Sequence, residues 1–294
     1  MSIKLPKIYL DSGNPEDTKR AKGILGFIDG QTTNPSLVAK NPEVVTFLSQ
    51  GKKLTEKELY DFYKQIVTEI QKELSGPLSV EVYADWNTKA TAMLTQAEEM
   101  STWGKNIYVK FPTIPEGITA AHEFVKKGGR VNMTLVFSQI QAAATYSATY
   151  TTKFPAFVSP FIGRWDDRGY DGLDLVKNIL KTYRRFDKQM KRKDCHVKVL
   201  AASIRNLAHF YSCIFIGADI LTVPLTVIKE WVHEENWVPD EHYRAEPTGL
   251  KPLRYEEIPF KSNYLDYTVE KTDGDLLDEG LKKFVKDWKS LIIS

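Results

Sequence analysis

The chain contains little cysteine and little histidine, which limits the metal and disulfide chemistry open to it. Its 294 residues include two cysteines, Cys195 and Cys213, and five histidines that show no paired spacing. Two separate thiols do not make a disulfide framework, and neither residue type is clustered as zinc sites require. We therefore expect no metal site and no scaffold held together by disulfides.

Excess charge of one sign and long apolar runs are also missing. The sequence has 40 basic and 38 acidic residues, a net charge of +2, so it gives no reason to expect a nucleic-acid partner. No stretch approaches the roughly 20 apolar residues that span a bilayer, and the N-terminal residues do not resemble a signal peptide. We expect a cytoplasmic protein without membrane partners, in which any anion site is built from a few local Arg and Lys residues.

Short apolar segments alternate with longer amphipathic ones along most of the chain. The short segments are rich in β-branched and aromatic residues, which is typical of strands, and they span residues 7–12, 25–30, 78–84, 106–111, 130–137, 156–163, 197–203 and 218–224. Helical periodicity marks the segments between them, such as 57–74, 88–102, 118–127, 138–149, 172–190 and 207–216. This alternation predicts an α/β fold, a (β/α)8 TIM barrel, with an open doubly wound sheet as the alternative.

The pattern changes after the last of these strands. We expect a catalytic barrel domain over residues 1–235 and a C-terminal extension over residues 236–294 that packs on the same domain. Residues 236–264 have no clear period, whereas residues 275–292 have one apolar face and predict a helix. This helix is expected either to cap the barrel or to contact a neighbouring subunit.

Polar side chains interrupt several predicted strands, although buried parallel strands are usually almost entirely apolar. Lys110 shares one strand face with Tyr108, Asn132 shares a face with Thr134, and Glu81 lies opposite its apolar neighbours. Because strand side chains alternate between two faces, each strand has one face for the helices and one face for the barrel interior. Barrel enzymes carry their chemistry on this inner face, near the C-terminal ends of the strands.

Lys110 has two possible interpretations. A lone lysine in a strand is commonly an edge residue whose ammonium group reaches solvent. A closed barrel has no edge, and a buried cation needs a partner or must lose its proton. Desolvation favours the neutral amine, which can attack a carbonyl group. Lys110 is therefore a candidate for Schiff-base formation.

Three segments at strand ends also have two interpretations. In 31-QTTNPSL-37 the Asn-Pro pair marks a turn and the possible start of a helix. In 159-SPFIGRWDD-167 Arg164 is either a surface residue or a ligand for an anion. Ser203 and Arg205 together suit an anionic head group, but a helix start followed by a solvated arginine has the same sequence.

Taken together, these segments resemble the transaldolase family. The matching motifs occur in the family's order and spacing over residues 7–230, and 275-DLLDEGLKKFVKDW-288 resembles the family's last helix. The motifs are 10-LDSGN-14, 32-TTNPSL-37, 80-VEVYA-84, 108-YVKFP-112, 132-NMTLVFSQIQA-142, 159-SPFIGR-164 and 201-AASIRN-206.

The resemblance implies a (β/α)8 barrel that uses a class I Schiff-base mechanism without a metal or an organic cofactor. Lys110 matches the Schiff-base lysine, and Asp11 matches the acid/base residue for the hydroxyl at the cleaved bond. Glu81 and Thr134 match the pair that holds a catalytic water. The positions that match substrate-binding residues are Thr33, Asn34, Asn132, Ser159 and Phe161, with Arg164, Ser203 and Arg205 at the sugar phosphate.

The implied reaction belongs to the pentose phosphate pathway. A dihydroxyacetone unit passes from sedoheptulose 7-phosphate or fructose 6-phosphate to erythrose 4-phosphate or glyceraldehyde 3-phosphate, and the enzyme is expected to be a homo-oligomer. The related fructose-6-phosphate aldolases, lyases that release free dihydroxyacetone, carry Gln and Tyr at the positions of Glu81 and Phe161, so these two residues favour the transferase. The lyase, a transaldolase for another anionic ketose and a non-catalytic sugar-phosphate-binding barrel are the alternatives.

Overall fold

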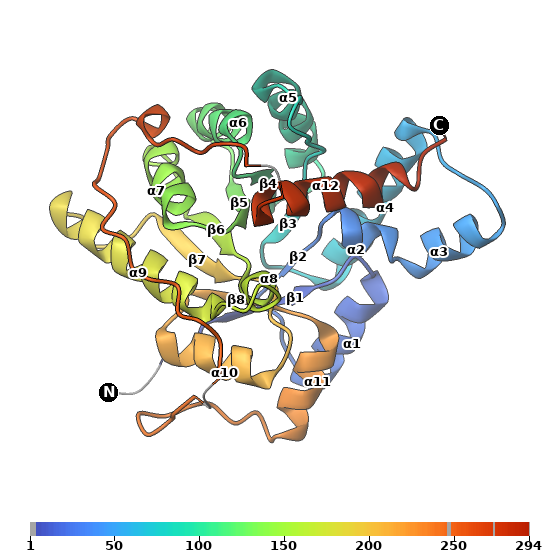
Figure 1. The fold of residues 1–294 in the computed structure, drawn as a ribbon. Coiled ribbons are helices and arrows are strands. Elements are labelled where there is room, and N and C mark those ends of the chain that lie inside the picture. Colours follow the sequence, from blue (N-terminus) through green and yellow to red (C-terminus); the bar gives the residue numbers. More distant parts are fainter. Residues whose placement is uncertain (1–3, 246–247, 273, 294) are drawn as a thin grey trace.

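The strands form a closed barrel of eight parallel strands with the helices around it (Figure 1). In this computed structural model, which describes residues 4–245, 248–272 and 274–293, each strand pairs with the next and β8 pairs with β1. The strands are β1 Lys7–Asp11, β2 Gly30–Thr32, β3 Leu78–Glu81, β4 Ile107–Pro112, β5 Val131–Val136, β6 Ala156–Pro160, β7 Val197–Ala201 and β8 Ile220–Val223. The predicted TIM barrel is confirmed, and the open sheet is excluded because β1 and β8 are joined.

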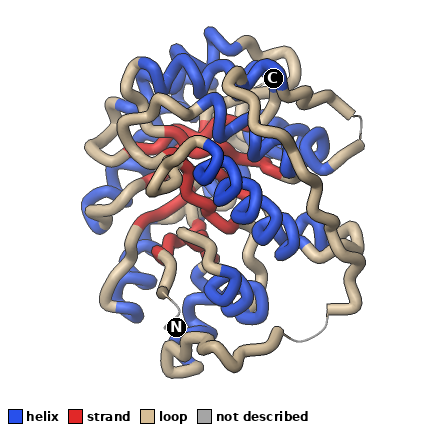
Figure 2. The backbone as a smooth tube through the Cα atoms, turned by 90° about the vertical axis from the view of Figure 1, so that its left-hand side faces the viewer, coloured by secondary structure: helices blue, strands red, loops and turns tan. Residues whose placement is uncertain are grey.

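Helices follow the strands and cover the outside of the barrel, as the tube in Figure 2 shows. They are α1 Pro15–Leu25, α2 Pro35–Ala39, α3 Pro42–Ser49, α4 Glu56–Glu73, α5 Ala90–Ser101, α6 Pro115–Lys126, α7 Gln139–Ala148, α8 Ile162–Asp166, α9 Gly172–Gln189, α10 Leu207–Ile216, α11 Leu225–His233, a 3-10 turn η1 Tyr264–Asp266, and α12 Leu276–Lys289. None of the helices in the described ranges is long and apolar enough to cross a bilayer.

Several helices begin where a strand has just ended, and the sequence provides the caps for this. The side chains of Asn14, Asn34 and Asn206 each accept a hydrogen bond from the first turn of the helix that follows, and Ser138 forms a capping box with Gln141. These caps place helix N-termini at the C-terminal ends of the strands. Backbone N–H groups and capping side chains therefore gather at the same end of the barrel as the polar strand residues.

The barrel interior is filled with aromatic residues below the polar ones. Tyr9, Tyr108 and Phe157 belong to a small apolar cluster separate from the main core, and the rings of Tyr108 and Phe157 stack with their centroids 4.1 Å apart. Tyr108 precedes Lys110 by two positions in β4, so it lies on the same face one layer closer to the N-terminal end of the strand. This packing closes the interior and leaves the polar residues at the C-terminal end.

The predicted boundaries of three strands are wrong by three residues or more, and one of them, predicted at 78–84, ends at Glu81. Residues 25–30 do not form the second strand, because α1 continues to Leu25 and ends at Gly26, which adopts a left-handed φ of 77°. The apolar run that suggested a strand is the end of this helix and a turn, and β2 begins at Gly30. The predicted strand 156–163 ends at Pro160, since the chain turns into α8 at Ile162.

The C-terminal extension crosses the outside of the barrel before it reaches the opening. We call residues 248–272 the C-terminal strap. It lies along α9 and α7, where Asn178 Nδ2 donates to Leu253 O at 2.9 Å and Ser147 Oγ donates to Lys261 O at 2.5 Å. The strap leads to α12, which lies beside α2 across the C-terminal end of the barrel (Figure 1).

Candidate functional site

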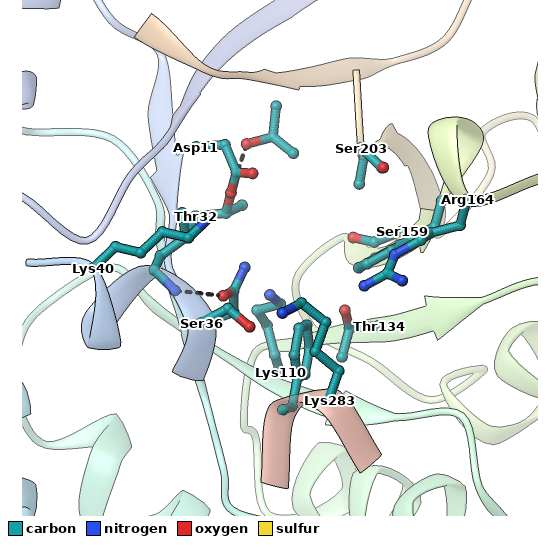
Figure 3. Close-up of a pocket in the computed structure, with 16 residues that line it drawn as sticks. Asp11, Thr32, Ser36, Lys40, Lys110, Thr134, Ser159, Arg164, Ser203 and Lys283 are labelled. Carbon is teal, nitrogen blue, oxygen red and sulfur yellow. Dashed lines mark hydrogen bonds between the residues drawn. The ribbon is translucent and has the colours of Figure 1, made fainter. Parts of the chain in front are cut away.

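A cavity of about 220 Å³ opens at the C-terminal ends of the strands (Figure 3). Its walls come from β1, β2, β4, β5, β6 and β8, from the loop after β7, and from α2, α8 and α12. The predicted site residues that line it are Asp11, Asn34, Lys110, Thr134, Ser159, Phe161, Arg164 and Ser203. Segments far apart in the sequence are therefore brought together in one cavity.

Lys110 lies in a buried polar setting rather than at an edge. Its side chain is 5% exposed, and its Nζ lies 2.8 Å from Glu81 Oε2. The same nitrogen donates a hydrogen bond to the backbone carbonyl of Thr33 at 2.9 Å. In the strand register Lys110 is the direct partner of Glu81 in β3 and of Asn132 in β5, so the three residues form one row across the barrel wall.

Glu81 is the counter-ion of this lysine and lies behind it, outside the lining of the cavity. Burial raises the pKa of the Glu81 carboxyl, and the neighbouring Lys110 ammonium opposes that shift. A carboxylate whose pKa is raised accepts a proton more readily. The two groups, 2.8 Å apart, are close enough to exchange a proton directly.

Asp11 ends β1 and is the acidic group that lines the cavity itself. Thr32 Oγ1 donates to Asp11 Oδ1 at 2.7 Å and lies 2.5 Å from Thr222 Oγ1 (Figure 3). Burial raises the pKa of Asp11, whereas the Thr32 hydrogen bond and the Lys110 charge oppose the shift. A carboxyl group held in this way is suited to take up a proton and to return it.

Asn132 supports the site from within the wall. It is fully buried, its Nδ2 donates to Ser79 Oγ at 3.1 Å, and its Oδ1 accepts from Ser159 Oγ at 2.7 Å. It does not line the cavity, whereas Ser159 does. The network therefore fixes the position of the Ser159 hydroxyl at the cavity. The predicted contact of Asn132 with substrate stays a prediction.

Thr134 presents a hydroxyl that has no hydrogen-bond partner within the described part of the chain, although it is fully buried. It lies at a bulge, where the pairing of β5 with β6 shifts register between Met133 and Val136 and Leu135 has a left-handed φ of 56°. Buried hydroxyls are normally satisfied, so this one identifies a place where a water or a ligand atom can bind.

Thr33 and Asn34 contribute different groups. The Thr33 hydroxyl turns away from the cavity to Tyr63 and Ser79, so only its carbonyl reaches Lys110. The Asn34 Oδ1 accepts from Leu37 N at 2.9 Å as the cap of α2, and this leaves its amide nitrogen available to a ligand.

The basic end of the cavity is formed by Arg164 and Ser203. No ion pair or hydrogen bond of Arg164 is found in the described ranges, and Ser203 adopts a left-handed φ of 59°, a strained conformation that often marks a functional position. The segment of Ser203 and Arg205 packs closely against Gly163. Only glycine fits there, because a Cβ would lie 2.8 Å from Ser203 O and 2.3 Å from Arg205 Nε.

Arg205 has a different environment from the one predicted. Both of its terminal nitrogens contact the carboxylate of Asp167, and the residue does not line the cavity. The structure thus brings Arg164 and Ser203 to the site and pairs Arg205 with an acidic neighbour. The role of Arg205 as a phosphate anchor stays a prediction.

Sequence reasoning missed several residues of the cavity. They are Thr32, Ser36, Leu37, Lys40, Ala202, Thr222, Lys283 and Phe284. Thr32 and Thr222 were detectable as polar residues inside short strands. Lys283 and Phe284 were not detectable, because the amphipathic pattern of α12 predicts a buried face but not the surface against which the helix packs.

Comparison with known proteins identifies the family of the chain. The family model described as transaldolase/fructose-6-phosphate aldolase matches residues 8–294. A "Probable transaldolase" of Bacteroides thetaiotaomicron is 40% identical over 225 residues, which are 76% of this chain and 88% of the relative. A "Probable transaldolase" of Syntrophomonas wolfei is 39% identical over 77% of this chain and 90% of its own length. The chain therefore belongs to the transaldolase/fructose-6-phosphate aldolase family.

Proposed function

We propose that the protein is a transaldolase that moves a dihydroxyacetone unit from a ketose phosphate to an aldose phosphate through a Schiff base on Lys110. The observation that carries this proposal is the position of Lys110. Its amine contacts Glu81 in the barrel wall, and the residue lines the same cavity as Asp11. The family membership and the names of its relatives support the same class of reaction.

In the first step the neutral Lys110 amine attacks the ketone carbon of the donor and forms a carbinolamine. Loss of water then gives the imine, and this step needs a proton for the departing hydroxyl. Glu81 can supply it, because its raised pKa favours the protonated form after it has taken the lysine proton. The unpaired Thr134 hydroxyl offers a binding place for the water that relays this proton.

In the second step the protonated imine withdraws electrons, and the adjacent carbon–carbon bond breaks. Asp11 accepts the proton of the hydroxyl at the carbon that leaves as an aldehyde, and an enamine of dihydroxyacetone remains on Lys110. An acceptor aldehyde then undergoes the reverse sequence, with Asp11 returning the proton. Hydrolysis of the new imine releases the product and regenerates the lysine.

Transfer rather than release depends on how the enamine is protected from protonation and water. Phe161 lines the cavity and packs edge-on against Phe137, with ring centroids 5.6 Å apart. Its apolar ring offers no hydroxyl that could orient a water on the intermediate. This favours the transferase over the lyase, in which free dihydroxyacetone would leave.

The negative end of each substrate requires a cationic partner, and Arg164 with Ser203 provides one at the side of the cavity. An arginine and a hydroxyl can bind a phosphate oxygen with charge-assisted hydrogen bonds. This remote binding orients the reacting end of the sugar toward Lys110.

The proposal is tested by supplying fructose 6-phosphate with and without erythrose 4-phosphate. We expect sedoheptulose 7-phosphate and glyceraldehyde 3-phosphate when both are present, and little free dihydroxyacetone when the acceptor is absent. Lys110→Met is the matched inactive control, because it keeps an unbranched side chain up to Cε and removes the amine. Release of dihydroxyacetone at the same rate without an acceptor would identify a lyase instead.

A further inference from the structure

The C-terminal helix α12 contributes a wall of the cavity. It approaches the barrel closely at Gly280, where an added Cβ would lie 3.0 Å from Leu135 Cδ2 in β5. One turn later Phe284, which is 7% exposed, and Lys283 line the cavity. The Lys283 side chain extends from α12 into the space that Lys110 and Arg164 also face (Figure 3). A helix from the end of the chain thus places a cation at the site.

Lys283 is held in this position by a carboxylate on its own helix. Asp287 lies one turn further along, with Oδ2 at 3.2 Å from Lys283 Nζ, and it also accepts a hydrogen bond from Ser36 Oγ in α2. The Ser36 contact fixes α12 to the rim of the cavity. Lys283 is still 47% exposed, so its ammonium group can exchange this partner for another anion without burial of a free charge.

The balance of charge in the cavity calls for a second cation. A phosphate monoester carries a charge of about −1.5 to −2 at neutral pH. Arg164 supplies one positive charge, Arg205 does not line the cavity, and Lys110 is the reacting group paired with Glu81. The other cations of the lining are Lys40 and Lys283, and the long-range charge of Lys40 acts on Asp11.

We propose that Lys283 binds the phosphate of the substrate together with Arg164, so that α12 helps to determine specificity for phosphorylated sugars. This inference rests on the proposed function. On binding, Lys283 exchanges the Asp287 carboxylate for a phosphate oxygen, and Asp287 keeps its hydrogen bond with Ser36. Arg164 and Lys283 then neutralise the dianion from the α8 side and the α12 side.

The test compares Lys283→Ala and Lys283→Arg with Lys286→Ala, a change of an exposed lysine of the same helix that does not line the cavity. We expect Lys283→Ala to raise the KM for fructose 6-phosphate about 10-fold, the factor for one lost contact of roughly 1.4 kcal/mol, with little change in kcat. Lys283→Arg should restore most of the binding, and Lys286→Ala should match the unchanged protein.

Two further measurements separate the possible failures. Borohydride trapping of unphosphorylated dihydroxyacetone on Lys110 should be equal in Lys283→Ala and the unchanged protein, and inorganic phosphate should bind Lys283→Ala about 10-fold more weakly in calorimetry. An unchanged KM and unchanged phosphate binding would overturn the inference, and so would equal losses with dihydroxyacetone. If the unchanged protein has no transferase activity, the proposed function fails, while the phosphate titration still decides the role of Lys283.

Discussion

Asp11 works in a setting that two threonines create. Thr222 on β8 contacts Thr32 on β2, and Thr32 donates to Asp11 on β1, so three strands hold one carboxylate. Burial raises the pKa of Asp11, and the Thr32 hydrogen bond limits this rise. In the proposed mechanism Asp11 acts as a base in its ionised form, which predominates above its pKa, so the threonine is expected to extend activity toward lower pH.

We predict that Thr32→Val moves the acidic limb of the pH profile of kcat/KM to higher pH. Loss of the hydrogen bond to the ionised carboxylate raises the pKa of Asp11 further, so more alkaline conditions are needed to ionise it. Thr32→Ser, which retains the hydroxyl, should leave the limb nearly in place. If the pH profile of Thr32→Val coincides with that of the unchanged protein, an ionisable group other than Asp11 controls the acidic limb.

At the scale of single residues, alternation in the strands was enough to find Lys110, Glu81 and Thr134, because a period of two assigns each residue to a face. The environment of Arg205 was not predictable. Its partner Asp167 comes from a different βα unit. Arg205 can lie this close to that unit because Gly163 has no Cβ.

The helix α12 is held against the barrel by a buried carboxylate at its start. Asp278 is fully buried, accepts from Trp86 Nε1 at 2.9 Å, and accepts from Gly274 N at 2.9 Å. The contact with Trp86 ties the last helix to the loop after β3. The wall of the cavity that α12 provides therefore depends on a contact distant from the reacting groups.

We predict that Asp278→Ala destabilises the fold by about 1–3 kcal/mol, because three donors, Trp86 Nε1, Gly274 N and Lys282 Nζ, lose their acceptor. Chemical unfolding measures the loss of stability. The substitution should increase the rate of amide hydrogen exchange in α12 more than it does in the strands. Glu279→Ala is the control, since that residue forms an exposed pair with Arg168 and should change stability little. Uniformly faster exchange in every element would contradict a local role for Asp278.

At the scale of elements, the sequence patterns located most strands but misplaced the second. Apolar residues at the end of α1 resemble a short strand, and only the left-handed Gly26 separates the two possibilities. The position of α12 was also undetermined, because an amphipathic face predicts burial and does not name the surface that it covers.

The barrel as a whole explains why the candidate residues meet. Parallel strands all end on the same side, so Asp11 from β1, Lys110 from β4 and Ser159 from β6 converge although they are far apart in the sequence. Closure between β1 and β8 brings Thr222 to Thr32, a contact across 190 residues. The closed barrel gives Lys110 no strand edge, and its side chain, which is 5% exposed, lines the cavity.

The most direct test of the account is the site of covalent attachment. The intact protein is incubated with fructose 6-phosphate, reduced with borohydride, digested and analysed by mass spectrometry. A Schiff base on Lys110 should give a reduced adduct on Lys110, none in Lys110→Met, and loss of transferase activity in proportion to the modification. An adduct on a different lysine, or continued turnover with no adduct, would contradict a Schiff-base mechanism at Lys110.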